Sequence, residues 1–150
     1  MRSALRVFRD ILREKGLKYT KQREALAKKI FSTRSHFSAQ EIYESLKDKV
    51  QISRATVYRT LNLLVENHII EEHDFGRGKK FYEFILGLES HNHVICLKCG
   101  KIEEFKSDLI EKVVDEIARD RNFRVRRYSF NVYGYCSQCQ EELFKDERRR

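Results

Sequence analysis

Residues 53–67 read SRATVYRTLNLLVEN, and residues 69–84 read IIEEHDFGRGKKFYEF. In the first segment Ser53 is placed to cap a helix, because a serine oxygen can accept a bond from a free N–H of the first turn. Three apolar residues recur on the inward side of that helix: Val57, Leu61 and Leu64. The second segment has two short strand-like runs on either side of Gly76-Arg77-Gly78, which predicts a β-hairpin with a basic tip.

Helical spacing also marks the residues before this segment. Leu5, Phe8 and Leu12 share one face of a first helix, and Gly16 is placed to end it. A second helix, 21–31, follows Thr20, and a third opens at the capping box that Ser38 forms with Glu41. Helices followed by a hairpin with a basic tip predict a winged helix-turn-helix, whose helix 54–67 enters the major groove. A plain helical bundle covered by a hairpin is the alternative.

The pattern changes at Gly87, so we place a hinge at 87–90 between a winged-helix domain, 1–86, and a second domain, 91–150. The second domain is predicted to be a small α/β unit with strands at 93–97 and 102–105, a helix at about 107–120 and a last strand at 123–135. Four residues of that helix are expected to face inward: Ile110, Val113, Val114 and Ile117. The predicted fold class is therefore α+β. A core of about 60 residues usually needs a metal or a partner subunit.

The charge is concentrated in the first domain. Residues 1–86 hold 18 Lys and Arg against 11 Asp and Glu, whereas residues 87–150 hold 13 against 12. A basic surface favours binding to nucleic acid, although a merely soluble basic surface would have the same composition. No apolar run approaches the ~20 residues that cross a bilayer, and the N-terminus lacks the pattern of a signal peptide. We therefore expect a soluble, cytoplasmic protein.

The four cysteines form two C-x-x-C pairs, Cys96 with Cys99 and Cys136 with Cys139, with 36 residues between the pairs. Two such pairs can complete a tetrahedral shell of four thiolates around Zn²⁺. Disulfides and a redox motif are the alternatives, and an intracellular chain disfavours the former. A shell of four sulfurs leaves no open position, so this zinc is expected to be structural.

His91 and His93 stand two residues apart, so on a strand both imidazoles would lie on one face. His36, Glu83 and Glu104 are other residues of the metal-binding types. The sequence alone does not assemble these five residues into one site. Taken singly, each is more often a surface or hinge residue.

Four motifs, which follow in order along nearly the whole chain, resemble those of the ferric uptake regulator (Fur) family. They are Gly16-Leu-Lys-Tyr-Thr20-Lys-Gln-Arg23, His36-Phe-Ser-Ala39, Ala55-Thr-Val-Tyr58-Arg59-Thr-Leu-Asn62 and His91-Asn-His93-Val-Ile-Cys96-Leu-Lys-Cys99-Gly100. The resemblance implies a dimeric, metal-responsive transcription regulator with an N-terminal winged helix, a hinge and a C-terminal dimerisation domain.

The resemblance also implies roles for individual residues. It gives the regulatory metal the ligands His36, Glu83, His91, His93 and Glu104, and the structural zinc the four cysteines. It assigns DNA contacts to Tyr58 and Arg59 of the recognition helix, and contacts with the phosphate backbone to Lys18 and Arg23. Arg54 and Thr56 lie on the same helix and complete the expected DNA-binding set.

The chain departs from the family at a third metal site that many members carry. Where they have a histidine, an aspartate, a glutamate and a late histidine, this chain has Ser90, Asn92, Glu111 and Tyr128. One carboxylate does not make a site, so we expect the third site to be absent or very weak.

The function expected from these observations is a regulator that binds pseudo-palindromic operators as a dimer, or as a tetramer, when it holds metal. His and Glu ligands suit Fe²⁺, with Mn²⁺ or Zn²⁺ as alternatives, and all four thiols are already assigned. We therefore expect an Fe²⁺-responsive repressor of iron-uptake genes, with zinc or peroxide sensing as the alternatives within the family.

Two other classes of protein stay open. A metallohydrolase could use the His/Glu site, but the chain has no HExxH, no nucleophile elbow and no phosphate-binding glycine loop, so we expect no enzyme. A zinc-ribbon module for RNA or protein contact is the other.

Overall fold

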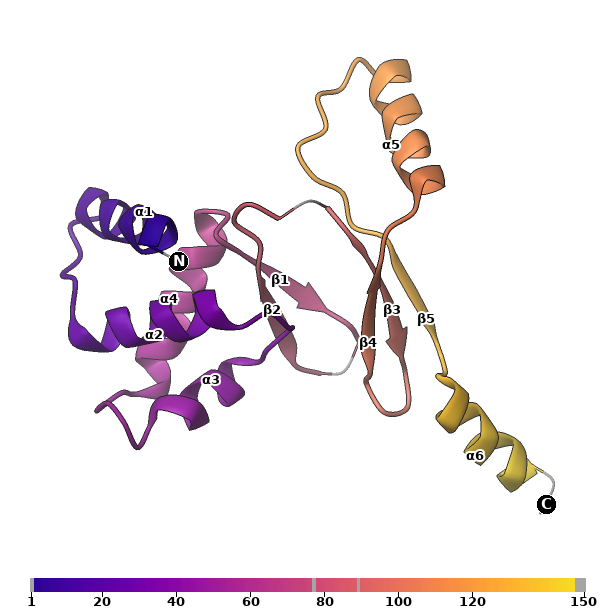
Figure 1. Cartoon of the computed structure of the whole chain (residues 1–150), viewed down its shortest axis with the longest axis horizontal. Helices are drawn as coiled ribbons and strands as arrows, with labels where there is room; N and C mark the ends of the chain where they lie inside the picture. Colours follow the sequence, from indigo (N-terminus) through magenta and orange to yellow (C-terminus); the bar gives the residue numbers. More distant parts are fainter. Residues whose placement is uncertain (1, 77, 89, 148–150) are drawn as a thin grey trace. The chain divides into compact units, whose positions relative to one another are not determined.

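The computed structural model describes residues 2–76, 78–88 and 90–147, and the chain divides into two compact units, Met1–Leu88 and Glu89–Arg150. Helices and small sheets are combined in each unit, and the predicted α+β class is confirmed (Figure 1). Arg77 of the expected basic tip and Glu89 of the expected hinge lie outside the described residues. No helix in the described ranges is long and apolar enough to cross a membrane.

Unit 1 begins with four helices: α1 (Arg2–Glu14), α2 (Lys21–Ser32), α3 (Ala39–Leu46) and α4 (Arg54–Glu66). The predicted caps form, because Thr20, Ser38 and Ser53 each accept a bond from a backbone N–H three residues ahead. Gly16, with φ of +64°, follows α1 in the left-handed region that glycine enters at little cost. The core is built from the apolar faces of these helices, including Phe8, Leu26, Ile42 and Leu61.

The predicted hairpin consists of β1 (Ile70–Asp74) and β2 (Lys80–Phe84), paired antiparallel with Glu71 opposite Glu83 and His73 opposite Phe81. An isolated bridge then joins β2 to the segment before α3, because the amides of Phe37 and Tyr82 each donate to the other's carbonyl. The bridge fixes the positions of the residues next to it, and two of these, His36 and Glu83, belong to the candidate site.

Unit 2 has a three-stranded sheet of order β4-β3-β5, formed by β3 (Asn92–Cys96), β4 (Ile102–Phe105) and β5 (Asn131–Gly134). The β3–β4 pair is antiparallel, and β5 runs parallel to β3. The expected strand over 123–135 is wrong for residues 123–130. His93 pairs with Asn131 and its amide donates to the carbonyl of Phe130, and because β3 begins at Asn92 it is too short to pair with residues further upstream.

Two helices complete unit 2: α5 (Asp108–Asp120) and α6 (Ser137–Glu147). No pattern in the sequence predicted α6. The expectation that the apolar residues of α5 face inward is wrong for the single chain, because no residue of α5 is buried. Val113 is 52% exposed and Ile117 is 54% exposed. The apolar side of α5 is present as predicted, but no element in the described part of unit 2 covers it.

Candidate metal centres and nucleic-acid interface

The four cysteines lie together at one end of the sheet of unit 2. The Sγ atoms of the four cysteines all lie within 4.8 Å of one another; the residues are Cys96, Cys99, Cys136 and Cys139. Cys96 ends β3, and the parallel pairing of β3 with β5 brings the chain back beside it. Gly100, with φ of +77°, makes the tight turn after the first pair, and Cys139 is carried by α6.

The geometry of this cluster fits a tetrahedral zinc ion. The Sγ atoms of Cys99 and Cys136 are 3.8 Å apart. Four sulfurs at the usual Zn–S distance of about 2.3 Å also stand about 3.8 Å from one another. The four cysteines are free thiols, so the disulfide alternative does not apply to this structure.

The electrostatics of the cluster favour a bound cation. Backbone N–H groups of Cys136 and Cys99 donate to the sulfur of Cys96 and lower the pKa of its thiol to about 5. Burial, together with the neighbouring sulfurs, raises the pKa of Cys139 to about 12. A doubly charged ion would stabilise all four thiolates at once, since only the thiolate is a good ligand.

Unit 1 holds two of the predicted regulatory ligands side by side. His36 precedes the Phe37–Tyr82 bridge and Glu83 follows it, so the bridge sets the imidazole next to the carboxylate. The distance from His36 Nε2 to Glu83 Oε2 is 3.6 Å, and both side chains are almost fully buried.

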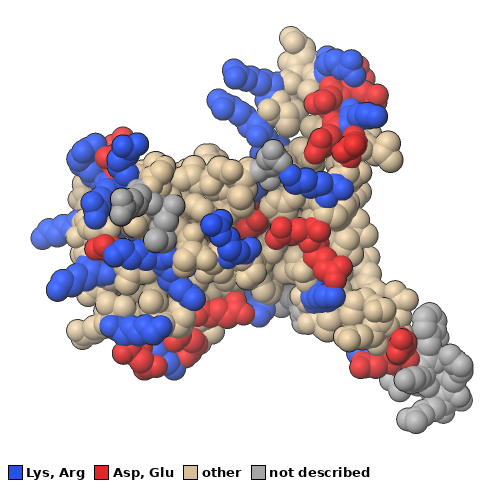
Figure 2. Space-filling view, viewed as in Figure 1, with Lys and Arg blue, Asp and Glu red and all other residues tan. Residues whose placement is uncertain are grey.

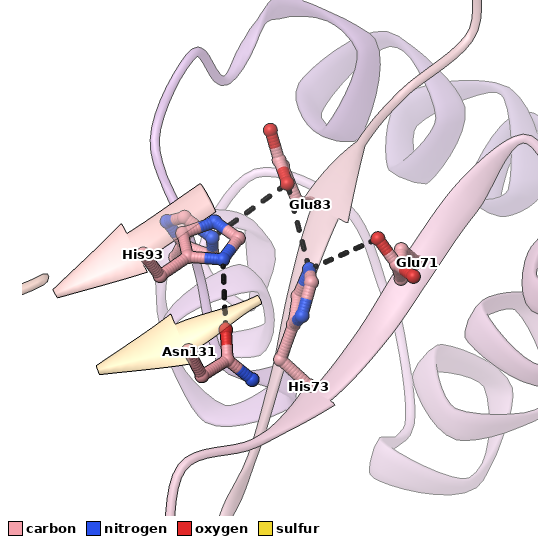
Figure 3. Close-up of polar contacts among 6 residues, drawn as sticks. Glu71, His73, Glu83, His93 and Asn131 are labelled. Atoms are coloured by element: carbon pink, nitrogen blue, oxygen red, sulfur yellow. Dashed lines mark hydrogen bonds and ion pairs between the residues drawn. The ribbon is translucent and has the colours of Figure 1, made fainter. Parts of the chain in front are cut away.

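The same carboxylate has a second imidazole beside it, that of His73, which was not among the predicted ligands. His73 Nε2 lies 3.4 Å from Glu83 Oε2 and 3.5 Å from Glu71 Oε2 (Figure 3). The ring of His73 is stacked on Phe75 and meets His36 edge to face. The sequence feature that could have indicated this contact is the two-residue spacing of Glu71 and His73, which places both side chains on one face of β1. The hairpin register then puts Glu83 opposite Glu71.

The remaining predicted ligands of the regulatory site belong to unit 2. The rings of His91 and His93 are 4.9 Å apart between centroids. Glu104 of β4 pairs with His93 of β3, so the two side chains leave the same face of the sheet. His93 Nδ1 is 3.3 Å from Asn131 Oδ1, a contact that orients the imidazole (Figure 3).

The predicted DNA-binding residues lie on the helices of unit 1, and four of them line one open groove of about 870 Å³. These four are Lys18, Arg23, Thr56 and Arg59. Gly16 and Ser53, which flank α1 and α4, also line the groove, so it lies between the α1–α2 turn and the start of α4. Figure 2 shows lysine and arginine side chains gathered over the helices of unit 1 on the face in view. Gln22 and Gln51, which the sequence did not indicate, line the same groove.

The other two predicted residues, Arg54 and Tyr58, lie on the exposed side of α4. Tyr58 is 51% exposed. Arg54 bonds to Gln40 of α3, and its guanidinium lies 4.7 Å from the centre of the Tyr43 ring. The basic face of α4 is therefore accessible, with Arg54 oriented by contacts from α3.

Comparisons with known proteins agree with this arrangement. The model of the Ferric uptake regulator family matches residues 14–133. The ferric uptake regulation protein of Campylobacter jejuni is 38% identical over 141 residues, which cover 92% of this chain and 89% of that protein. The protein of the same name from Bacillus subtilis is 34% identical and covers 85% of this chain and 89% of its own length.

Solved structures give the same result. The Helicobacter pylori ferric uptake regulator, described with three functional metal binding sites, is 31% identical, with a TM-score of 0.81 and coverage of 93% of both chains. The Francisella tularensis ferric uptake regulator, solved with iron, is 32% identical, with a TM-score of 0.71, and covers 83% of this chain and 96% of that one.

Proposed function

The chain belongs to the ferric uptake regulator family, a family of metal-responsive transcription regulators, and on that premise we propose that it is a cytoplasmic, Fe²⁺-responsive repressor of iron-uptake genes. It acts by binding a pseudo-palindromic operator as a dimer, or as a tetramer of two dimers. The observation that carries this function is the division of the regulatory ligands between the units. His36 and Glu83 lie before the Leu88–Glu89 division, and His91, His93 and Glu104 lie after it.

The division supplies a mechanism for the switch. An ion that takes ligands from both units restricts their relative orientation, and operator binding requires the restricted orientation, in which two winged helices match two half-sites. To move such an equilibrium from 1:99 to 99:1, the ion must favour one state by about 5.5 kcal/mol. Ligands contributed from two sides of a hinge supply that difference, because an ion held by one unit alone would bind both states equally well.

The ligand set fits iron. Three imidazoles and two carboxylates suit Fe²⁺, Mn²⁺ or Zn²⁺, and no thiolate is available because all four cysteines gather in one cluster. That cluster holds a structural Zn²⁺ with a closed shell, which stabilises unit 2 and takes no part in sensing. The Fe²⁺ assignment also agrees with the Francisella tularensis relative that was solved with iron.

DNA recognition is assigned to unit 1. Lys18 and Arg23 of the groove contact phosphates, and Tyr58 and Arg59 of α4, with Arg54 and Thr56, follow the major groove. A groove lined by two cationic side chains beside the start of a helix suits a phosphate backbone.

Dimerisation is assigned to the uncovered apolar side of α5. Leu109, Val113 and Ile117 are exposed on it and line an apolar cavity of about 320 Å³ with Phe130. Burying such a side chain stabilises a complex by about 1.5–3 kcal/mol, so a second copy of this chain is the fitting partner for the face.

The decisive experiment measures operator binding under anaerobic conditions. Fluorescence anisotropy with a labelled palindromic promoter fragment is recorded with and without Fe²⁺, for the wild type and for His36→Ala. We expect Fe²⁺ to tighten binding of the wild type by at least a hundredfold, and His36→Ala to lose most of that gain while keeping its zinc. If the metal-free wild type bound the operator as tightly as the loaded form, the proposed switch would be wrong.

The fit to Fe²⁺ and the absence of catalysis are tested separately. Mn²⁺ and Zn²⁺ in the same titration rank the ions, and a hydrolase screen of the metal-loaded chain tests the His/Glu set for catalysis. We expect Fe²⁺ to act at the lowest free concentration and no turnover in the screen.

A further inference from the structure

We propose that unit 1 contains a second metal site, formed by Glu71, His73 and Glu83 and named here the wing site. The three residues lie on the two strands of the hairpin and need nothing from unit 2. The occupant is a divalent transition-metal ion in tetrahedral coordination, of which Zn²⁺ is the best fit, with water as the fourth ligand.

The hairpin register creates the site. Glu71 and Glu83 are directly opposite each other in the antiparallel pair, so their side chains leave the same face. His73 is two residues from Glu71 on β1, which places its imidazole on that face as well. Figure 3 shows His73 with contacts to both carboxylates. Two like charges opposite each other destabilise a hairpin unless a cation lies between them.

The distances separate a metal site from a hydrogen-bonded triad. His73 Nε2 is 3.5 Å from Glu71 Oε2 and 3.4 Å from Glu83 Oε2. Both distances exceed the usual N–H···O range of about 2.7–3.2 Å. Nitrogen and oxygen ligands that are about 2.0–2.1 Å from a tetrahedral ion stand about 3.3–3.4 Å from each other. The three ligand atoms also lie within 4.8 Å of one another, so they form one cluster that small side-chain adjustments bring around one ion.

Packing holds the imidazole in place. The His73 ring is stacked on Phe75, with an angle of 7° between the two planes. An imidazole held by packing and two carboxylates on a paired hairpin need little rearrangement to take an ion.

The wing site shares one atom with the proposed regulatory site. Glu83 Oε2 is 3.4 Å from His73 Nε2 and 3.6 Å from His36 Nε2, so the same oxygen would serve either ion. We infer that the two ions compete, and that the chain holds one ion in addition to its zinc. This competition rests on the proposed function, whereas the wing site itself does not. An ion in the wing site contacts unit 1 alone and cannot restrict the orientation of the units.

The test isolates the wing site in the full chain by removing two regulatory ligands with His91→Ala/His93→Ala. Titration with Co²⁺ is followed by the visible absorption of tetrahedral Co²⁺ and by metal content. Charge-transfer absorption from sulfur reports any exchange into the four-cysteine cluster. We expect this variant to bind one Co²⁺ per chain outside the cluster.

Adding His73→Asn to this variant should weaken Co²⁺ binding at least tenfold. His68→Asn, which changes an exposed histidine of the same unit, should leave binding unchanged. Because His73 is buried, Glu71→Gln provides a second variant, since the Glu71 side chain is 24% exposed and tolerates the change more easily. It should weaken Co²⁺ binding to a similar extent.

Two results would overturn the wing site: no Co²⁺ bound outside the cluster in His91→Ala/His93→Ala, or binding that neither His73→Asn nor Glu71→Gln weakens. A failure of the proposed function is seen elsewhere, in the Fe²⁺ dependence of operator binding by the wild type.

The competition between the two ions has its own measurement. His73→Asn in the otherwise unchanged chain should lower the Zn²⁺ concentration that gives half-maximal operator binding, and an unchanged concentration would contradict it.

Discussion

The backbone N–H of Cys136 donates a hydrogen bond to the sulfur of Cys96 over 3.3 Å, and so ties the segment after β5 to the end of β3. The two residues are 40 positions apart in the sequence, and among the described residues of unit 2 only five are buried: Asn92, His93, Ile95, Cys96 and Cys139. The small sheet therefore depends on the cysteine cluster for its stability.

Cys96→Ser is expected to lose the structural zinc and to unfold unit 2. Structural zinc sites contribute roughly 10–16 kcal/mol of apparent binding free energy, which is more than the marginal stability of a small domain. Limited proteolysis should cleave the variant within residues 90–147 while unit 1 resists, and metal analysis should find one zinc ion per chain fewer than in the wild type. Gln138→Ala, an exposed position between two of the cysteines, is the control. A variant that lacks the zinc of the cluster and keeps wild-type resistance would show that the cluster is dispensable.

Replacing Lys18 or Arg59 by alanine is expected to weaken operator binding and its dependence on salt. Each cation that neutralises a phosphate releases a counterion, so losing one reduces the slope of log K against log salt by about one. Anisotropy titrations at several salt concentrations give the slope. Lys28→Ala removes a lysine that pairs with Glu24 outside the groove, and should change neither quantity.

The sequence predicted those parts of the fold in which a local signal coincides with the structure. The serine and threonine caps, the apolar stripe of α4 and the hairpin around Gly76 are local, and each was confirmed. The spacing of the cysteines predicted a cluster, because two C-x-x-C pairs can complete a tetrahedral shell of four thiolates around one ion. The prediction of a strand over residues 123–130 was wrong because it depends on a distant partner and not on the local pattern alone. Their alternating pattern is typical of a strand, but a strand also needs a partner, and β3 is too short to provide one.

In the candidate sites too, contacts that depend on the folded chain could not be predicted from local sequence. His73 carries no motif, and only the register of the hairpin places it between Glu71 and Glu83. Similarly, Lys18 and Arg59 are 41 residues apart in the sequence and line one groove only after α1, α2 and α4 have packed. The five regulatory ligands came from the family resemblance, since nothing in their spacing joins His36 to Glu104.

Ile117→Glu is expected to convert the dimer to a monomer. The side chain lies on the uncovered apolar side of α5, and a carboxylate there would have to be buried against the second copy without a partner. Analytical ultracentrifugation should show a shift to the mass of one chain, with a matching loss of operator affinity. Glu116→Gln changes the adjacent, exposed residue of α5 and should remain dimeric. A dimeric Ile117→Glu would place the interface elsewhere.

Ser38→Ala is expected to lower the free energy of unfolding of unit 1 by about 1 kcal/mol, the usual value of an N-cap. The serine hydroxyl accepts from the Glu41 amide at 3.2 Å, and the Glu41 carboxylate accepts from the Ser38 amide at 2.6 Å. Ser45→Ala, in the same helix, removes a serine that bonds only to the helix backbone at Ile42 and should be close to neutral. Urea unfolding of the three proteins gives the comparison, and equal midpoints would contradict a role for the capping box.

The third metal site should be restored by Ser90→His, Asn92→Asp and Tyr128→His together. The wild type lacks it because a serine and an amide replace two ligands and the phenol replaces a third. Burial raises the pKa of Tyr128, and the carboxylates of Glu111 and Asp115 raise it further, so the phenol stays protonated and cannot act as an anionic ligand. The three substitutions would give Glu111 two imidazoles and a carboxylate as companions, which is a sufficient set for Zn²⁺ or Mn²⁺.

Metal analysis after equilibrium dialysis should find one more ion per chain in this triple variant than in the wild type, which holds its zinc and one further ion. Adding Glu111→Gln to the triple variant is the matched control, because it removes the one ligand that the wild type retains at this site. The gain should then disappear while the other two ions remain. An additional ion in the wild type that is lost on Glu111→Gln would instead show that Glu111 already holds a metal with ligands other than the family's.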